Sequence, residues 1–152
     1  MNSQTDTMIT VAKIGELAAA TLDTGEILQR VVSITARIMK VDVCSIYLLE
    51  PSEDVLILAA TRGLRDDAIG KVRIAPGEGI TGRAFKQERI VAVSDVTRDR
   101  RNMYIPITGE DEYRSLLSVP LKFHDEFIGV INVQTRAPRM FNNHERRLLK
   151  TI

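Results

Sequence analysis

The segment PGEGITGRAF at positions 76–85 contains a glycine pattern that could bind a phosphate-bearing cofactor. Gly77, Gly79 and Gly82 form a G-x-G-x-x-G, the spacing with which dinucleotide-binding enzymes hold a pyrophosphate at a helix N-terminus. Such enzymes also need an acidic residue about 20 residues further on, and Asp95 ends the predicted strand RIVAVSD. The motif alone is a weak signal, so the surrounding elements decide between a cofactor site and a structural turn.

Cysteine and histidine offer little for catalysis or metal binding. Cys44 is the single cysteine, which excludes an internal disulfide and a cysteine-based metal cluster and suits a reducing cytoplasm. It lies in an apolar segment, where a thiol is usually an inert small hydrophobe. His124 and His144 are expected at a hairpin turn and a helix start, so neither haem ligation nor a two-histidine metal site is expected.

The charged and hydroxyl-bearing residues also lack a catalytic arrangement. No Ser/His/acid trio and no pair of carboxylates stands at a suggestive spacing. Arg98, Arg100 and Arg101 are interleaved with Asp99 and could bind a phosphate, but the pattern is more typical of a solvated loop. We therefore expect no catalytic residues, no metal and no cofactor.

The bulk composition indicates one soluble domain. The chain has 152 residues, 44% hydrophobic and 27% charged, which is enough for a single core. A net charge of +1 gives no reason to expect nucleic acid or an anionic membrane as the main partner. No secretory signal pattern is present and no apolar stretch approaches the ~18 residues of a membrane span, so we expect a cytoplasmic domain.

Apolar periodicity predicts two helices followed by a series of strands. The first helix is expected at 8–22 and the second, started by Asp23 and Glu26, continues to about residue 40. The apolar face of the second helix is expected to be Ile27, Val31, Ile34 and Ile38. The later elements are a hairpin at 41–63, a strand at 69–76, a short helix at 79–88, a strand at 89–95, a polar loop at 96–113 and a hairpin at 114–136.

A last helix is predicted from Asn142 or Asn143. Its apolar side is Leu148, Leu149 and Ile152, and no stop signal follows. We therefore expect residues 1–152 to be one domain of a longer protein.

This element order argues against a dinucleotide fold. Such a fold needs repeated β-α-β units, whereas hairpins here precede and follow the glycines and predict a mainly antiparallel sheet. A proline also separates the glycines from the preceding strand, which carries outward Lys71 and Arg73. In the structural interpretation, Gly77 and Gly79 supply positive φ and Gly82 lets the helix approach the sheet. A second interpretation, in which the helix N–H groups face a ligand cavity, stays open beside it.

The same segments carry a resemblance to a known family. PGEGITG, the strand SVPL, and IGVINVQ with a Phe-x-x-x-acid helix start, in this order, resemble a GAF domain along nearly the whole chain. Within the family, VDVCSIYLL, GKVRIAPGEG and YIPITGEDEYRSLLSVPL look most similar to the GAF domains that begin the nitrogen-branch enzyme I of the phosphotransferase system. Similar domains occur in sensor histidine kinases.

The resemblance implies an α+β fold of the PAS/profilin-like type. Its sheet has about six mainly antiparallel strands, with the terminal helices on one face and a ligand pocket between the other face and the short helix. It also implies a regulatory module without enzymatic activity of its own. Such a module binds a small metabolite or dimerises, and controls an attached phosphotransferase or histidine kinase.

The chemistry of particular family members transfers only in part. Cyclic-nucleotide-binding GAF domains carry Asn-Lys before Phe-x-x-x-Asp-Glu, whereas this chain has Thr135-Arg136, and Arg146 follows Glu145. Cyclic nucleotides are therefore an alternative ligand and not the leading one. Phe141 and Glu145 also have a structural explanation, as staple and capping partner of a helix start. The single cysteine argues against a bilin linkage and against methionine sulfoxide reductase chemistry, which needs more than one thiol.

Strand alternation separates Ser45 and Tyr47 from Cys44, Ile46 and Leu48. The first pair suits a cavity, and the apolar set suits the side covered by helices. By the resemblance, ligand contacts are expected at Ser45, Tyr47, Gly79, Ile80, Thr81, Tyr104, Thr108, Glu110 and Ser115. Mixed hydroxyl, aromatic and backbone donors suit a small polar metabolite such as an amino acid, and ordinary core packing and loop hydrogen bonding is the alternative.

Two functional hypotheses follow. The leading one is a sensory domain that binds a small metabolite and regulates an attached signalling enzyme. The alternative is a ligand-free homodimerisation module, in which a parallel bundle forms from Ile14, Ala18, Ile27, Val31 and the helix from Asn142.

Overall fold

The computed structural model describes residues 24–102, 108 and 112–151, so the helix predicted at 8–22 lies outside the described residues. The predicted strands and the short helix are present in the predicted order. The elements are α2 (Thr24–Met39), β1 (Val43–Glu50), β2 (Val55–Arg62), the 3-10 helix η1 (Asp66–Ala68), β3 (Arg73–Ile74), α3 (Gly79–Gln87), β4 (Val91–Val93), the 3-10 helix η2 (Val96–Arg98), β5 (Ser115–Phe123), β6 (Glu126–Thr135) and α4 (Asn143–Lys150).

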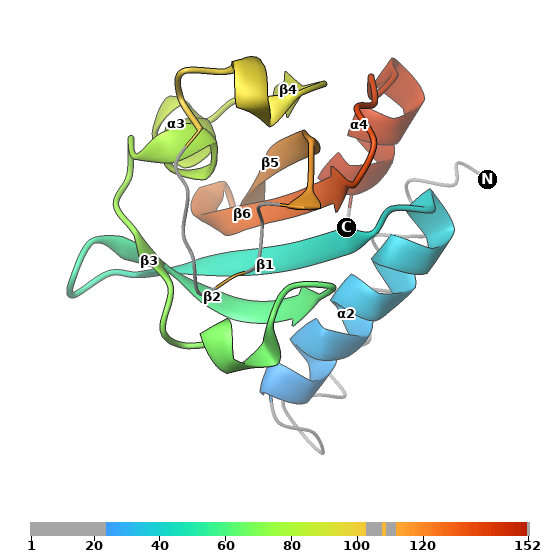
Figure 1. Cartoon of the computed structure of the whole chain (residues 1–152). Coiled ribbons are helices and arrows are strands. Elements are labelled where there is room, and N and C mark those ends of the chain that lie inside the picture. Colours follow the sequence, from blue (N-terminus) through green and yellow to red (C-terminus); the bar gives the residue numbers. More distant parts are fainter. Residues whose placement is uncertain (1–23, 103–107, 109–111, 152) are drawn as a thin grey trace.

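The strands form one six-stranded sheet in the order β3-β2-β1-β6-β5-β4. Every neighbouring pair is antiparallel, and β1–β2 and β5–β6 are the two predicted hairpins. In Figure 1, α2 and α4 lie to the right of the sheet and α3 to its upper left. The α+β class is confirmed, and the antiparallel sheet excludes the dinucleotide fold that the glycine motif suggested.

The two faces of the sheet carry different sets of side chains, as the alternation predicted. On the helix face, under α2 and α4, Cys44 and Ile46 belong to a core cluster with Val32, Ala36, Met39, Ala60, Leu117, Val119, Ile131, Val133, Phe141 and Leu149. On the opposite face, here called the α3 face, Tyr47 belongs to a cluster with Leu56, Leu58, Ala68, Val72, Ile74 and Val130. The predicted separation of Tyr47 from Cys44 and Ile46 is confirmed.

The predicted apolar face of α2 is confirmed for Ile27, which is buried, and Val31, which packs against the core, but not for Ile34 and Ile38. Its buried residues are Ile27, Val32, Thr35, Ala36 and Met39. Ile34 and Ile38, which we expected in the core, are 42% and 61% exposed. The large β-branched side chains misled the prediction, because the small Thr35 and Ala36 let the helix approach the sheet closely. The side-chain amide of Gln29 also fixes the rotation, donating to the Thr61 carbonyl at 2.8 Å and accepting its N–H at 3.4 Å.

The glycine turn has the geometry that the structural interpretation predicted. Gly77 and Gly79 have φ of +93° and +59°, a backbone region that residues other than glycine rarely adopt. A Cβ on Gly82 would stand 2.4 Å from the carbonyl oxygen of Ala75, which is sterically forbidden. The G-x-G-x-x-G therefore serves a tight turn and a close backbone approach.

The start of α4 is fixed by a capping box, as predicted for Glu145. Asn142 Oδ1 accepts the N–H of Glu145 at 2.8 Å, and the Glu145 carboxylate accepts the N–H of Asn142 at 3.1 Å. Arg139 forms an ion pair with Glu145 and donates to the carbonyl of Lys40 at 3.1 Å. The end of α2 and the start of α4 are thereby joined through one side chain.

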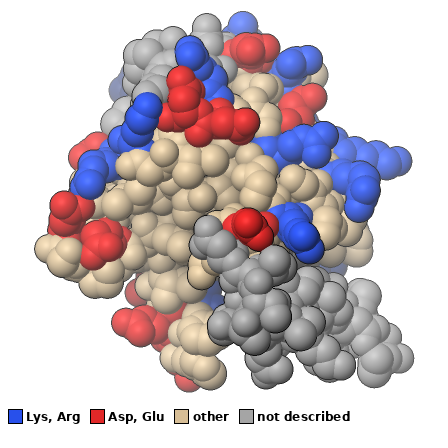
Figure 2. Space-filling model, turned by 90° about the horizontal axis from the view of Figure 1, so that it is seen from below, with Lys and Arg blue, Asp and Glu red and all other residues tan. Residues whose placement is uncertain are grey.

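Charge is mixed over the surface shown in Figure 2, which views the molecule from below relative to Figure 1. Lysine, arginine, aspartate and glutamate surround an uncharged central area without separating by sign. Among the described residues, no helix is long and apolar enough to cross a membrane.

Candidate ligand-binding site

A row of buried polar side chains crosses the α3 face. Ser118 on β5 is in register with Asn132 on β6, Asn132 with Ser45 on β1, and Ser45 with Thr61 on β2. All four side chains are at most 2% exposed. We call Ser118, Asn132, Ser45 and Thr61 the polar row. Buried polar groups need hydrogen-bond partners, so their arrangement on four adjacent strands requires an internal network.

The polar row is hydrogen-bonded both within the sheet and to α3. Ser118 Oγ donates to Asn132 Oδ1 at 2.6 Å, and the hydroxyls of Ser45 and Thr61 lie 2.8 Å apart. Asn132 Nδ2 donates to Thr81 Oγ1 at 2.8 Å, which ties the first turn of α3 to the centre of the sheet. This bond adds to the packing of Ile80 and Ala84 between α3 and the sheet.

Apolar clusters stand on both sides of the polar row. Tyr47, 2% exposed, lies in the cluster towards β2 and β3. Ile80, also 2% exposed, packs with Ala84, Val91, Val93, Val96 and Leu116. Apolar walls around a few hydrogen-bonding groups are the usual composition of a small-ligand site. The pocket expected here stays a prediction, because residues 103–107 and 109–111 of the loop expected over it lie outside the described residues.

Apart from Ser115, the predicted ligand contacts separate into three groups. Ser45, Tyr47, Ile80 and Thr81 are buried between the sheet and α3, and Gly79 opens that helix. Thr108 is buried and its carbonyl accepts the N–H of Arg65 at 3.2 Å. Tyr104 and Glu110 lie outside the described residues, so their predicted role stays a prediction.

Ser115 differs from the other predicted contacts because it lies on the helix face. It is in register with Thr135 on β6, and the alternation along β5 places it with Leu117 instead of Ser118. Its Oγ is hydrogen-bonded to Thr135 Oγ1. Ser115 was expected as a ligand contact by the family resemblance, and that role stays a prediction; the serine of β5 that lies on the α3 face is Ser118.

Three polar-row residues, Ser118, Asn132 and Thr61, were not predicted from the sequence. Each is a polar residue beside apolar ones in its strand (SVPL, VINV and LAAT), and that was the available signal. It becomes specific only when strand register shows that they lie side by side.

Other groups considered from the sequence have structural roles. Asp95 accepts hydrogen bonds from the hydroxyl of Thr97 at 2.6 Å and from its N–H at 3.1 Å. These hydrogen bonds lower the pKa of Asp95, and the bond from the Thr97 hydroxyl has the largest effect; burial acts in the opposite direction and raises the pKa. Asp99 binds the guanidinium of Arg101 through both carboxylate oxygens, at 2.9 and 2.6 Å. Asp95 therefore caps the start of η2, and the carboxylate of Asp99 is paired with Arg101 from the same loop.

The single thiol is unsuited to nucleophilic chemistry. Cys44 is fully buried in the helix-face cluster, and burial raises the pKa of its thiol to about 12. It is therefore protonated at neutral pH and lacks the thiolate that reactive cysteines need. Among the described residues, no group of three or more His, Cys, Asp or Glu could hold a metal ion.

The antiparallel sheet, the flanking helices and the glycine turn over the α3 face define the class of protein. The GAF domain family model matches residues 23–152, and the chain belongs to that family.

Among individual relatives, a protein of Escherichia coli K12 named "Phosphoenolpyruvate-dependent phosphotransferase system" is 30% identical over 114 residues, 75% of this chain and 15% of that protein. The Nif-specific regulatory protein of Herbaspirillum seropedicae is 25% identical over 152 residues, 95% of this chain and 28% of that protein. The chain thus spans less than a third of the length of either relative. GAF domains similar to this one therefore occur in regulatory proteins.

Solved structures show the same fold. The GAF domain from Acinetobacter phosphoenolpyruvate-protein phosphotransferase superposes with a TM-score of 0.77 at 30% identity, covering 98% of this chain and 87% of that chain. Free methionine-R-sulfoxide reductase from Neisseria meningitidis has a TM-score of 0.73 at 21% identity, covering 99% of this chain and 86% of that chain, and shares the fold alone. Because that enzyme has the same fold, the expectation of no enzymatic activity for this chain stays a prediction.

Proposed function

We propose that this GAF domain is a sensory module that binds a small polar metabolite at the polar row. The observation that carries the proposal is the line of buried hydroxyl and amide groups on four strands, joined to α3 through Asn132 and Thr81. The likeness to a phosphotransferase-system protein and a Nif-specific regulatory protein supports a regulatory role, with an attached phosphotransferase as the proposed output. An attached histidine kinase rests on the sequence resemblance alone.

The chemistry of the site favours a ligand with several hydrogen-bonding groups, such as an amino acid. A ligand carboxylate at the polar row would meet hydroxyl and amide donors but no positive charge, so further N–H donors would favour its binding. The N-terminus of α3 is suited to this, since the side chain of Glu78, its N-cap residue, makes no capping hydrogen bond.

Regulation requires that the ligand bind two states of the domain with different affinity. A difference of about 1–3 kcal/mol is typical of allosteric coupling. In this proposal the ligand replaces Thr81 as the acceptor of the hydrogen bond from Asn132 Nδ2, and α3 shifts against the sheet.

The test is a thermal-shift and calorimetric screen with amino acids, 2-oxoglutarate and cyclic nucleotides. We expect one class to raise the melting temperature, and the effect to disappear in Asn132→Leu. Asn143→Leu, the same change at an exposed residue of α4, is the matched control and should bind like the wild type. A screen in which no compound binds would refute metabolite sensing for these classes.

A second candidate is a ligand-free dimerisation module. The observation in its favour is the exposure of Ile34 and Ile38 on the outer side of α2, whereas the exposed Arg30 and Arg37 beside them oppose pairing of this face with itself. Ile27, which we expected in the bundle, is instead buried within the domain, and Ile14 and Ala18 lie outside the described residues. Light scattering over a range of concentrations tests this candidate, and a monomer at every concentration would remove it.

A further inference from the structure

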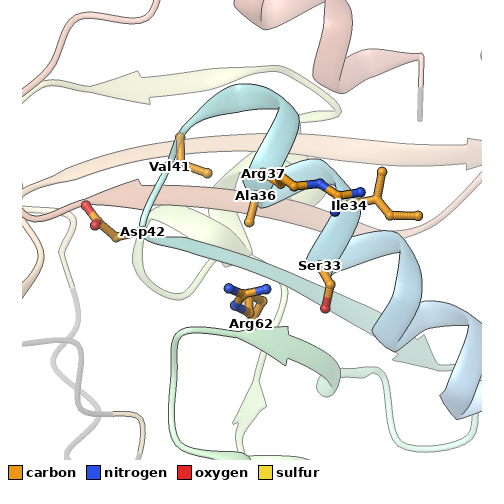
Figure 3. A pocket seen from close by; sticks show the side chains of 7 residues that line it. All are labelled: Ser33, Ile34, Ala36, Arg37, Val41, Asp42 and Arg62. Atoms are coloured by element: carbon orange, nitrogen blue, oxygen red, sulfur yellow. The ribbon is translucent and has the colours of Figure 1, made fainter.

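A pocket of about 370 Å³ lies away from the polar row, between α2, the segment that leads into β1, and the end of β2. Figure 3 shows its lining: α2 forms one side, the guanidinium of Arg62 lies between Ser33 and Asp42 in this view, and Arg37 extends beside Ile34. We call this the α2 groove. It is lined by Ser33, Ile34, Ala36, Arg37, Val41, Asp42 and Arg62.

The α2 groove is lined by two guanidinium groups and one carboxylate, that of Asp42, so its charged side chains have a net positive charge. Arg37 and Arg62 are both exposed, and neither forms an ion pair within the described residues. Asp42 also lines the groove, but its Oδ2 accepts the backbone N–H of Arg136 at 2.8 Å. Two guanidinium groups beside one pocket present donors that match carboxylates from a partner.

Apolar side chains border these arginines. Ile34, at 42% exposure, lines the groove, and Ile38, at 61%, follows one turn later on the same side of α2. A single exposed isoleucine is ordinary, but two on adjacent turns beside a pocket form a continuous apolar strip. A partner would have to offer carboxylates and apolar side chains together.

A second copy of the chain does not meet this requirement through the same face. Arg30 is exposed one turn before Ile34, and Arg37 lies between Ile34 and Ile38. Self-pairing of this face would bring Arg30 and Arg37 of one copy against those of the other, whether the helices run parallel or antiparallel. Like charges held in an interface weaken association.

We propose that the α2 groove docks an acidic–apolar segment of a partner protein, with a carboxylate bound between Arg37 and Arg62 and an apolar side chain on Ile34 and Ile38. A docked segment would contact α2, the residues that lead into β1, and the end of β2. It does not depend on a metabolite at the polar row.

The test is selection of random peptides displayed on phage against the immobilised domain, followed by fluorescence anisotropy with the most enriched synthetic peptide. We expect the enriched sequences to combine Asp or Glu with Leu, Ile or Phe. Binding should weaken about tenfold or more in Arg37→Glu/Arg62→Glu, because charge-assisted hydrogen bonds are lost. A peptide with its acids changed to lysine should bind this variant in preference to the wild type.

The control is Lys71→Glu/Arg147→Glu, which changes the net charge equally at two exposed residues that do not line the groove. This variant should bind the selected peptide like the wild type. Enriched peptides without acids, no enrichment, or equal binding by Arg37→Glu/Arg62→Glu would each overturn the proposal. A wild-type dimer that the same double substitution dissociates would overturn it in favour of a second copy.

Discussion

The two faces of the sheet are built from the same strands but differ in polar content. The helix face is mainly apolar, with one buried polar pair, Ser115 and Thr135, whereas the α3 face holds the polar row between two apolar clusters. Cys44 and Ser45 are neighbours in the chain and both fully buried, yet the thiol lies in an apolar cluster and the hydroxyl is hydrogen-bonded to Thr61. Apolar residues on both faces would serve stability at least as well, because an internal hydrogen bond adds only about 1 kcal/mol net. The α3 face thus has hydrogen-bonding groups beyond what stability needs, which favours a binding role there.

The largest expected effect comes from the helix face. Ile131→Ala removes a fully buried side chain from the cluster under α2 and α4, and should lower the free energy of unfolding by about 2–5 kcal/mol. Urea denaturation followed by circular dichroism measures the loss. Ile128→Ala on the same strand is the control, since Ile128 is 37% exposed and should cost far less. Equal losses would contradict the description of the helix face as the main core.

The next prediction concerns the bond between the polar row and α3. Asn132→Ala leaves buried partners unsatisfied and should cost about 1–3 kcal/mol. Combined with Thr81→Val, it should be non-additive by about 0.5 kcal/mol or more, because both changes remove the same hydrogen bond. Urea denaturation of the two single variants and the double variant gives this coupling.

Ser45→Ala combined with Thr81→Val is the control for that cycle. Ser45 bonds to Thr61 and not to Thr81, so these two losses should add. A vanishing coupling between Asn132 and Thr81 would mean that the polar row does not hold α3, and the proposed route from ligand to helix would fail.

The features that could be predicted from the sequence depend on residues that are close together in the chain. Alternation along β1 separated Tyr47 from Cys44, glycine backbone freedom gave the turn at Gly77 and Gly79, and the Asn142–Glu145 spacing gave a capping box. Each of these features depends on residues within four positions of one another, so local physics is sufficient.

What the sequence could not predict depends on strand register and helix rotation. The polar row joins four strands, and its alignment is set by hairpin geometry and by irregularities such as those at Ile46/Tyr47 and Leu121/Lys122. The rotation of α2 depends on the sheet surface that Ala36 meets and on the Gln29 amide, so Ile34 was expected inside and lies outside. A periodicity argument considers only the size and polarity of each side chain, and it does not include contacts with residues that are distant in the sequence.

The smallest expected effect is the pH dependence of stability that the buried Cys44 thiol causes. Burial raises the pKa of Cys44 from its ordinary 9.0 to about 12 in the folded state, whereas the unfolded chain keeps the ordinary value. Below 9 the thiol is protonated in both states; above it the unfolded chain loses the proton first, so stability falls as pH rises towards 12. Between about pH 8 and pH 10 this loss should be roughly 1 kcal/mol by urea denaturation, and Cys44→Ala should lack it. Equal pH slopes for the wild type and the variant would show that water reaches the thiol, and that the helix face is less completely apolar than its cluster indicates.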